Sequence, residues 1–169
     1  MSPVGENPCM ACEMCAGIAA MEAGGDANAV ARLVTGYVTI CATQYFRGYT
    51  FFEAKACVRE IYDLPRAERD LHLHEMSEVT LAIARAFRPA KMNYEALGNG
   101  VPHLHWHLIP RYDTDPHPRG PVWEDLGFLR QFWLRGAETE QSERDDARQS
   151  LLAELRRVDV DIEREFVGP

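Results

Sequence analysis

The chain has 169 residues and a mass of 19.1 kDa, the length expected of one domain with appendages. Its 18 Lys and Arg against 26 Asp and Glu give a net charge of −8, which disfavours nucleic acid polymers and anionic membrane surfaces as partners. No window approaches the roughly 18 apolar residues that a membrane helix needs.

The first element is a cysteine-rich segment that contains Cys9, Cys12 and Cys15. Their two-residue spacing suits ligation of a tetrahedral metal ion better than a disulfide framework. No basic region followed by an apolar stretch precedes them, so we expect an unsecreted, cytoplasmic protein whose thiols stay reduced. Residues 16–23 follow and have the composition of a short helix, which Gly24 and Gly25 end.

The next segments predict a pair of strands and a long helix. Residues 30–43 and 49–54 are rich in β-branched and aromatic side chains and flank a turn at Arg47–Gly48. Residues 65–87 repeat apolar side chains at intervals of three and four, which predicts an amphipathic helix. His72 and His74 diverge on this helix, and we expect both on its solvated face.

A second hairpin and an acidic tail complete the chain. Residues 91–97 and 103–111 are expected to be extended, on either side of the turn Gly98-Asn99-Gly100. The acidic segment 138–165 carries one apolar stripe, which predicts a helix laid on the body or on a second subunit. We therefore divide the chain into a domain over residues 1–123 and a C-terminal acidic helical extension over residues 124–169.

Three histidines alternate along the last predicted strand, at positions 103, 105 and 107. A strand sends alternate side chains to opposite faces, so His103, His105 and His107 should share one face, about 6.6 to 6.8 Å apart between neighbours. Imidazoles at this spacing provide a neutral nucleophile, hydrogen-bond donors or metal ligands near neutral pH. The alternative is a solvated strand edge on which histidine happens to alternate.

The sequence around these histidines, NYEALGNGVPHLHWHLIPR over residues 93–111, resembles the histidine triad (HIT) family of nucleotide hydrolases and transferases. Weaker similarity extends through residues 44–57 and to Cys12–Cys15. The resemblance implies an α+β, HIT-like fold, with an antiparallel sheet of about five strands, a long helix packed on it and a C-terminal helical tail. It also implies a homodimer that binds a purine nucleotide in a cleft over the sheet.

By the same resemblance, His105 is the nucleophile that attacks the α-phosphorus and forms a nucleotidyl-histidine intermediate. His107, on the same face, is placed to donate to the phosphoryl oxygens, and His103 completes the catalytic set. The substrate would be a dinucleoside polyphosphate or a nucleoside phosphoramidate. Two alternatives stay open: a nucleotide-binding regulatory module that barely turns over, and a catalytic metal held by two of the histidines.

Further positions bear on substrate binding. The resemblance gives Asn93 and Asn99 amide contacts with the phosphate, although turn formation beside Gly98 and Gly100 is an alternative for both. His117 lies on the strip that follows the triad, which we expect to fold over the phosphates with Arg111 or Arg119. Tyr49 stands where many relatives carry an additional histidine.

The resemblance also implies a structural zinc ion. Relatives that bind zinc use a cysteine pair, the first triad histidine and the histidine of a lysine-x-histidine signature, and these positions are here Cys12, Cys15, His103 and Cys57. The site would be Cys₃His, a closed tetrahedral set. Cys9 is a rival ligand, and the alternative for Cys57 is a free buried cysteine. We expect the fifth cysteine, at position 41, in the core.

Overall fold

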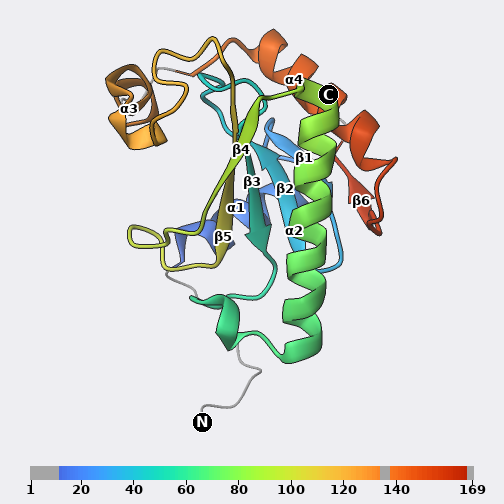
Figure 1. Cartoon of the computed structure of the whole chain (residues 1–169). Coiled ribbons are helices and arrows are strands. Elements are labelled where there is room, and N and C mark those ends of the chain that lie inside the picture. The colour runs from blue at the N-terminus through green and yellow to red at the C-terminus, as the bar shows by residue number, and fades with distance from the viewer. Residues whose placement is uncertain (1–11, 134–137, 167–169) are drawn as a thin grey trace.

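Six strands form one antiparallel sheet in the order β4-β5-β3-β2-β1-β6 in the computed structural model, which describes residues 12–133 and 138–166 (Figure 1). The α+β fold expected from the sequence is confirmed. The strands are β1 (Ala29–Arg32), β2 (Gly36–Ile40), β3 (Thr50–Ala54), β4 (Lys91–Glu95), β5 (His105–Arg111) and β6 (Arg164–Glu165).

Two strand assignments differ from the sequence-based expectation. The single strand expected over 30–43 is a tight hairpin, because the Leu33 amide donates to the Gly36 carbonyl and reverses the chain between β1 and β2. The tail is not helical to residue 165, since its last described residues form β6 along the open edge of β1. There the Phe166 amide donates to the Val30 carbonyl. The backbone groups at the edge of β1 are thus hydrogen-bonded, which a helix packed in this place would not achieve.

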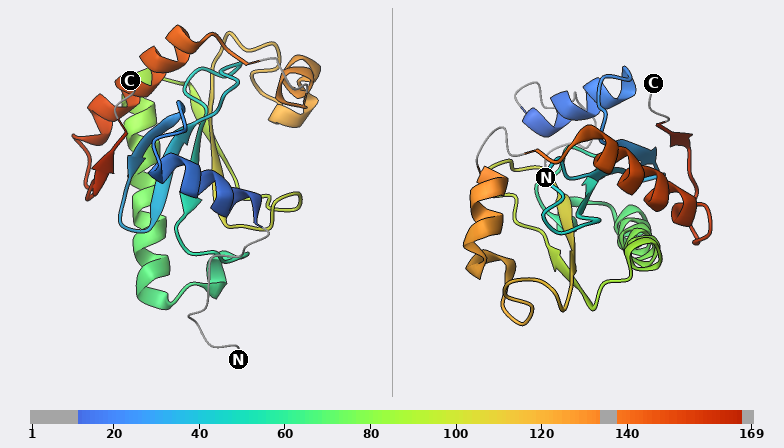
Figure 2. Two further views of the ribbon diagram at one scale, coloured as in Figure 1. Left: turned by 180° about the vertical axis from the view of Figure 1, so that it is seen from behind. Right: turned by 90° about the horizontal axis from the view of Figure 1, so that it is seen from above.

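Helices cover both faces of the sheet. Helix α2 (Arg66–Phe87) and helix α4 (Gln141–Leu155) pack against one face and share its main hydrophobic core, whereas α1 (Glu13–Glu22) lies on the opposite side (Figure 2). The remaining helical elements are η1 (Ile61–Asp63), η2 (Val122–Glu124) and α3 (Leu126–Trp133). None of the helices in the described part of the chain has the length and apolar content of a membrane span.

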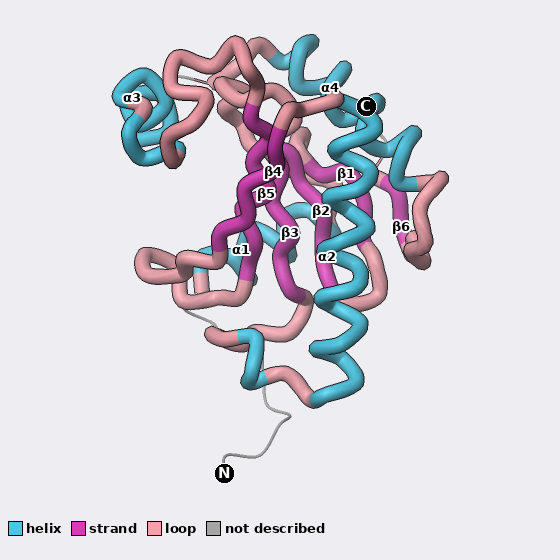
Figure 3. The backbone as a smooth tube through the Cα atoms, in the orientation of Figure 1, coloured by secondary structure: helices cyan, strands magenta, loops and turns pink. Residues whose placement is uncertain are grey.

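The connections to and from β5 run along one side of the molecule. The loop between β4 and β5 and the segment that carries α3 both project on the left in Figure 3. Positive backbone dihedrals occur at two expected turns, with φ of +85° at Gly48 and +63° at Gly98, a conformation that glycine adopts readily. These turns set where the loops beside β3 and β5 lie.

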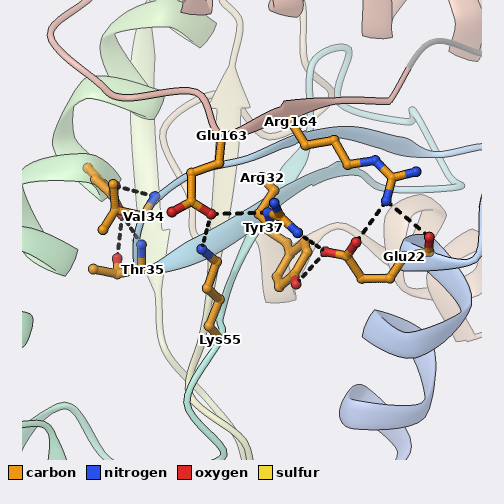
Figure 4. Close-up of polar contacts among 9 residues, drawn as sticks. Glu22, Arg32, Val34, Thr35, Tyr37, Lys55, Glu163 and Arg164 are labelled. Atoms are coloured by element: carbon orange, nitrogen blue, oxygen red, sulfur yellow. Dashed lines mark hydrogen bonds and ion pairs between the residues drawn. The ribbon is translucent and has the colours of Figure 1, made fainter.

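Charged side chains bind α1 and the C-terminal edge to the sheet (Figure 4). The Glu22 carboxylate accepts from the Tyr37 hydroxyl at 2.7 Å and pairs with Arg32 and Arg164, each at 2.8 Å. Glu163 pairs with Lys55 at 2.6 Å and also lies 3.1 Å from Arg32. The network connects α1, β1 and β2 with β6 and the residue directly before it, although partly exposed ion pairs each contribute little stability.

His72 is buried, so the expectation that it lies on the solvated face of α2 is wrong. The Trp106 indole donates to its Nε2 at 3.2 Å, its Nδ1 lies 2.9 Å from the Thr35 hydroxyl, and its ring stacks on Phe52. The hydroxyl of Thr35 donates in turn to the Glu75 carboxylate. The apolar periodicity of α2 conceals this polar contact, because its partners come from distant strands. His74 is exposed, as expected.

This burial predicts loss of stability in acid. Desolvation lowers the pKa of His72 to about 4, below its value of about 6.5 in the unfolded chain. The unfolded state therefore gains a proton first, and the stability present above pH 6.5 is lost progressively down to about pH 4. At about pH 5, His72 alone should cost roughly 2 kcal/mol. Urea unfolding at about pH 7.5 and at about pH 5 measures the free energy of unfolding that is lost in acid. The loss should be smaller in His72→Gln than in wild type or in the control His74→Gln. Equal losses in the three proteins would contradict this account.

Candidate active site

His105 and His107 face the same side of β5, opposite to Trp106 and the α2 core. Both rings are buried, and their Nε2 atoms lie 3.1 Å apart. The strand register places Glu53 directly across from His105 and Phe51 across from His107, on the neighbouring strand β3. Directly opposed residues share a face, so these four side chains form one surface.

His103 lies two residues before His105, where strand β5 begins. Its ring places Nδ1 at 3.4 Å from the Cys12 sulfur and Nε2 at 2.8 Å from the Ala54 carbonyl oxygen. That its ring shares one face with the other two stays a prediction from the alternation of a strand.

The contacts of the His105 and His107 rings, taken as neutral, indicate which of their nitrogens carry protons. His105 Nδ1 lies 2.6 Å from the His103 carbonyl oxygen, which only accepts, so Nδ1 is the protonated nitrogen and Nε2 keeps its lone pair. The Nε2 of His107 must then donate to the Nε2 of His105. The Tyr49 hydroxyl, 2.5 Å from His107 Nδ1, completes the chain as a donor.

The imidazole of His107, in the middle of this series of hydrogen bonds, stays neutral near neutral pH. Burial, reinforced by the neighbouring His105, lowers the pKa of His107 to about 4. Sequence reasoning noted Tyr49 only as a departure from relatives. Tyr49 directly precedes β3, and the pairing of β3 with β5 brings its hydroxyl to His107.

A pocket of about 490 Å³ opens over the histidine pair, a volume suited to a small ligand. Among the described residues that line it there is no lysine and no arginine. A second pocket of about 300 Å³, which also reaches His105 and Asn99, includes Arg59. The larger pocket is lined by Met14, Phe51, Glu53, Leu97, Gly98, Asn99, Gly100, Val101, His105, His107, Trp123, Phe132 and Trp133.

Glu53 is the acidic residue of this pocket, and sequence reasoning missed it. Its side chain is largely buried, with 8% exposed, and it accepts a hydrogen bond from the Thr39 hydroxyl at 2.8 Å. Burial raises the pKa of this carboxyl group to about 7. A glutamate within a buried strand was the signal, because such a position normally carries an apolar side chain.

The structure brings Asn99 to the pocket but places Asn93 and Arg111 elsewhere. The Arg111 guanidinium is buried, where it pairs with Asp115 at 2.9 Å and donates to Asn93 Oδ1 at 3.3 Å. It also donates to the carbonyl oxygens of His117 and Gly120, at 2.7 and 2.8 Å. Arg111 therefore holds the loop that follows β5, and neither pocket includes it. A substrate contact for Asn93 or Arg111 stays a prediction from the sequence.

Cys12, Cys15, Cys57 and His103 form a cluster that could hold a metal ion such as zinc. One ligand atom from each lies within 4.8 Å of the others. The tautomer of His103 fits this role, since Nε2 donates to the Ala54 carbonyl and leaves Nδ1 free toward the sulfurs. Cys9 lies outside the described residues, and Cys41 is buried in a separate hydrophobic cluster, as expected.

Comparison with known proteins agrees with this geometry. Residues 48–114 match the model of the HIT domain. A histidine triad protein from Marinobacter aquaeolei VT8 is 26% identical, with a TM-score of 0.63 over 78% of this chain and 92% of that one. One from Bradyrhizobium japonicum is 25% identical, with a TM-score of 0.58 over 77% and 90%.

A hypothetical histidine triad nucleotide-binding protein from Sulfolobus tokodaii strain7 is 13% identical and shares the fold, with a TM-score of 0.62 over 82% of this chain and 90% of that one. No curated protein matches the sequence.

The cysteine cluster predicts a bound metal ion that depends on Cys57. Replacing this exposed residue by serine removes a thiolate ligand with little change in shape, so metal affinity should fall by about tenfold or more. The metal content after dialysis against a chelator, and Tm with and without chelator, measure the effect. Cys41→Ala, outside the cluster, should keep the wild-type metal content. Equal metal retention in Cys57→Ser and wild type would refute the cluster as a metal site.

Proposed function

We propose that this chain, whose residues 48–114 match the HIT domain, is a nucleotide hydrolase or nucleotidyl transferase acting at the α-phosphate of a purine nucleotide derivative. The substrate classes considered are dinucleoside polyphosphates and nucleoside phosphoramidates. One observation supports the reaction above all: the hydrogen bond from His105 Nδ1 to the His103 carbonyl leaves Nε2 unprotonated in a pocket large enough for a nucleotide.

In the proposed reaction, His105 Nε2 forms a bond to the α-phosphorus while the bond from phosphorus to the leaving group breaks. The leaving group takes the bonding electron pair, and a nucleotidyl-His105 intermediate results. Water then attacks phosphorus, the phosphorus–nitrogen bond breaks and its electron pair returns to Nε2. The hydroxyl of the water ends on the nucleoside monophosphate, and its remaining proton goes to the leaving group or to solvent. In a transfer reaction another acceptor replaces water.

His107 is the nearest neutral donor to the reacting phosphorus. When substrate occupies the pocket, its Nε2–H can turn from the lone pair of His105 to a phosphoryl oxygen, where it stabilises the charge that develops in transfer. Tyr49 keeps the proton on Nε2 by donating to Nδ1. Asn99, in the pocket wall, offers a further amide donor.

The metal cluster has a structural part in this proposal. Cys12, Cys15, Cys57 and His103 form a Cys₃His set, which suits zinc, and an ion held by these four residues would link the chain segments that carry them. His103 then has two functions: its ring joins the cluster, and its carbonyl oxygen orients the nucleophile. Cys12 and Cys15 attach the start of α1 to the same point.

Other expectations from the sequence belong to the same proposal. We place the protein in the cytoplasm, where reduced thiols remain available for the metal. We infer a homodimer, by analogy with the family. We also keep the division into a HIT-like domain over residues 1–123 and an acidic helical extension over 124–169.

The covalent step is tested on His105. His105→Ala should lower kcat by about 10³-fold or more, because no other group in the pocket replaces the nucleophile. Wild-type protein quenched under acid-free conditions during turnover should carry a nucleoside monophosphate on His105, detected by mass spectrometry. His74→Ala, at an exposed histidine of α2 away from the pocket, serves as the control with normal turnover. Full activity of His105→Ala would exclude the reaction, and nucleotide affinity without any adduct or turnover would instead identify a binding module.

Tyr49 is tested as a positioning residue. Tyr49→Phe removes the donor that fixes the proton of His107, so we expect kcat to fall about tenfold while KM changes little. Tyr49→His restores a ring nitrogen donor and should recover part of kcat, which a role in packing alone would not explain. Tyr112→Phe, whose hydroxyl donates to the Arg47 carbonyl outside the pocket, is the matched control. If Tyr49→Phe keeps the wild-type kcat, this assignment is wrong.

A further inference from the structure

Glu53 lines the larger pocket, yet the reaction proposed above gives its carboxyl group no role. Its Oε1 accepts from the Thr39 hydroxyl, whereas Oε2 has no hydrogen bond to another residue of the described chain. Among the described residues that line this pocket there is no lysine or arginine to pair with the carboxylate. A buried carboxylate without a cation is costly, so it would stabilise a positive charge that arises in the pocket.

The adjacent strand β5 places one group beside Glu53 that can acquire such a charge. The pairing of β3 with β5 sets Glu53 directly across from His105. Directly opposed residues of an antiparallel pair have Cβ atoms about 4.5 to 5.5 Å apart and point to the same face. Both residues are 8% exposed, so little water screens one side chain from the other. The carboxyl group and the imidazole are therefore electrostatic neighbours.

The imidazole of His105 gains a positive charge when its Nε2 bonds to phosphorus. Nδ1 keeps its proton, because the His103 carbonyl oxygen accepts from it and has no proton to give. With a proton on one nitrogen and phosphorus on the other, the ring of the nucleotidyl intermediate is an imidazolium. The attacking ring is neutral, so a carboxylate beside it stabilises the transition state and the intermediate more than the ground state.

The protonation of Glu53 sets the pH range in which this stabilisation acts. Burial raises the pKa of its carboxyl group to about 7, the Thr39 hydroxyl opposes the rise, and the carboxylate of Asp26 adds to it. Glu53 is therefore mostly ionised above about pH 7 and mostly protonated below it. The titratable and charged groups that face it are Asp26 from the loop before β1, Tyr37 directly across on β2, and His105 and His107 on β5.

We propose that Glu53 is a positioning residue that acts through His105: its carboxylate stabilises the positive charge on the imidazole in the nucleotidyl intermediate. The inference rests on the proposed function and adds a charged partner to the neutral donors His107 and Asn99. Glu53 exchanges no atom with the substrate, and the phosphorus–nitrogen bond forms and breaks as described above. A carboxyl group that is protonated at the start releases its proton to solvent as the imidazolium forms.

Glu53→Gln tests the charge, because glutamine has nearly the same shape and its side-chain oxygen can still accept from Thr39. With adenosine phosphoramidate as substrate at about pH 8, adduct formation on His105 in a single turnover should slow by about tenfold or more. Affinity for AMP should stay the same or rise, because a carboxylate repels phosphate in the ground state. Glu53→Asp keeps the charge and should recover part of the rate, and no recovery in this variant would count against the inference.

The pH dependence separates the charge from a role in packing. The rate of wild type divided by that of Glu53→Gln should rise from near one at about pH 5.5 to about tenfold at about pH 8, because Glu53 is charged only above its pKa. A ratio that does not change over this range would indicate a structural role and overturn the inference. Glu143→Gln, which removes an exposed charge on α4 behind the sheet, is the matched control and should keep the wild-type rate.

Inorganic phosphoramidate separates failure of this inference from failure of the proposed function. In its reaction with an imidazole, the phosphorus–nitrogen bond of the reagent breaks, ammonia leaves and the phosphoryl group bonds to the ring nitrogen. Peptide mass spectrometry at about pH 8 should show His105 modified about tenfold more slowly in Glu53→Gln than in wild type, with the exposed His74 modified equally in both. This result supports the role of Glu53 even if wild type forms no nucleotide adduct. Equal modification of His105 in the two proteins would overturn it even if the nucleotide adduct forms.

Discussion

The short hydrogen bond from His105 Nδ1 to the His103 carbonyl is the contact on which the candidate site depends. It leaves Nε2 of the neutral His105 ring with a lone pair. His107 Nε2 must then donate to that lone pair, and the Tyr49 hydroxyl donates to His107 Nδ1. A carbonyl oxygen has no proton to give, so the sequence of donors has a single direction. Because His103 also belongs to the cysteine cluster, the same residue connects that cluster to His105.

The pairing of β5 with β3 turns one face of β5 to the pocket and the other to the core under α2. On one face His105 and His107 lie opposite Glu53 and Phe51. On the other, the indole of Trp106 donates to His72 in α2, which fixes the strand against the main core. A shift of one residue in register would exchange these faces and bury His105 and His107 beneath α2. The polar contact behind the sheet therefore helps hold the two imidazoles toward the pocket.

Local features of this chain were predictable from sequence, and contacts between distant segments were not. The spacing of apolar side chains locates α2, and glycine identifies the turns at Gly48 and Gly98. The resemblance brought together the four residues of the metal cluster. In contrast, the burial of His72 depends on Thr35 and Trp106, which are distant in sequence. Arg111 binds the loop after β5 only because that loop folds back onto its guanidinium. Trp133 reaches the pocket only through the packing of α3, which no periodicity in the sequence reports.

The electrostatics of the site follow from these placements. A chain of net charge −8 offers little long-range attraction to an anionic substrate, and the larger pocket adds the buried carboxyl group of Glu53. Phosphate is accommodated in such a pocket when its partners are neutral donors that lose little hydration, such as the imidazole of His107 and the amide of Asn99. Among the described residues that line the larger pocket none carries a fixed positive charge, whereas the second pocket that reaches His105 includes Arg59. The two approaches to His105 therefore differ in charge, and an anionic group is favoured on the side of Arg59.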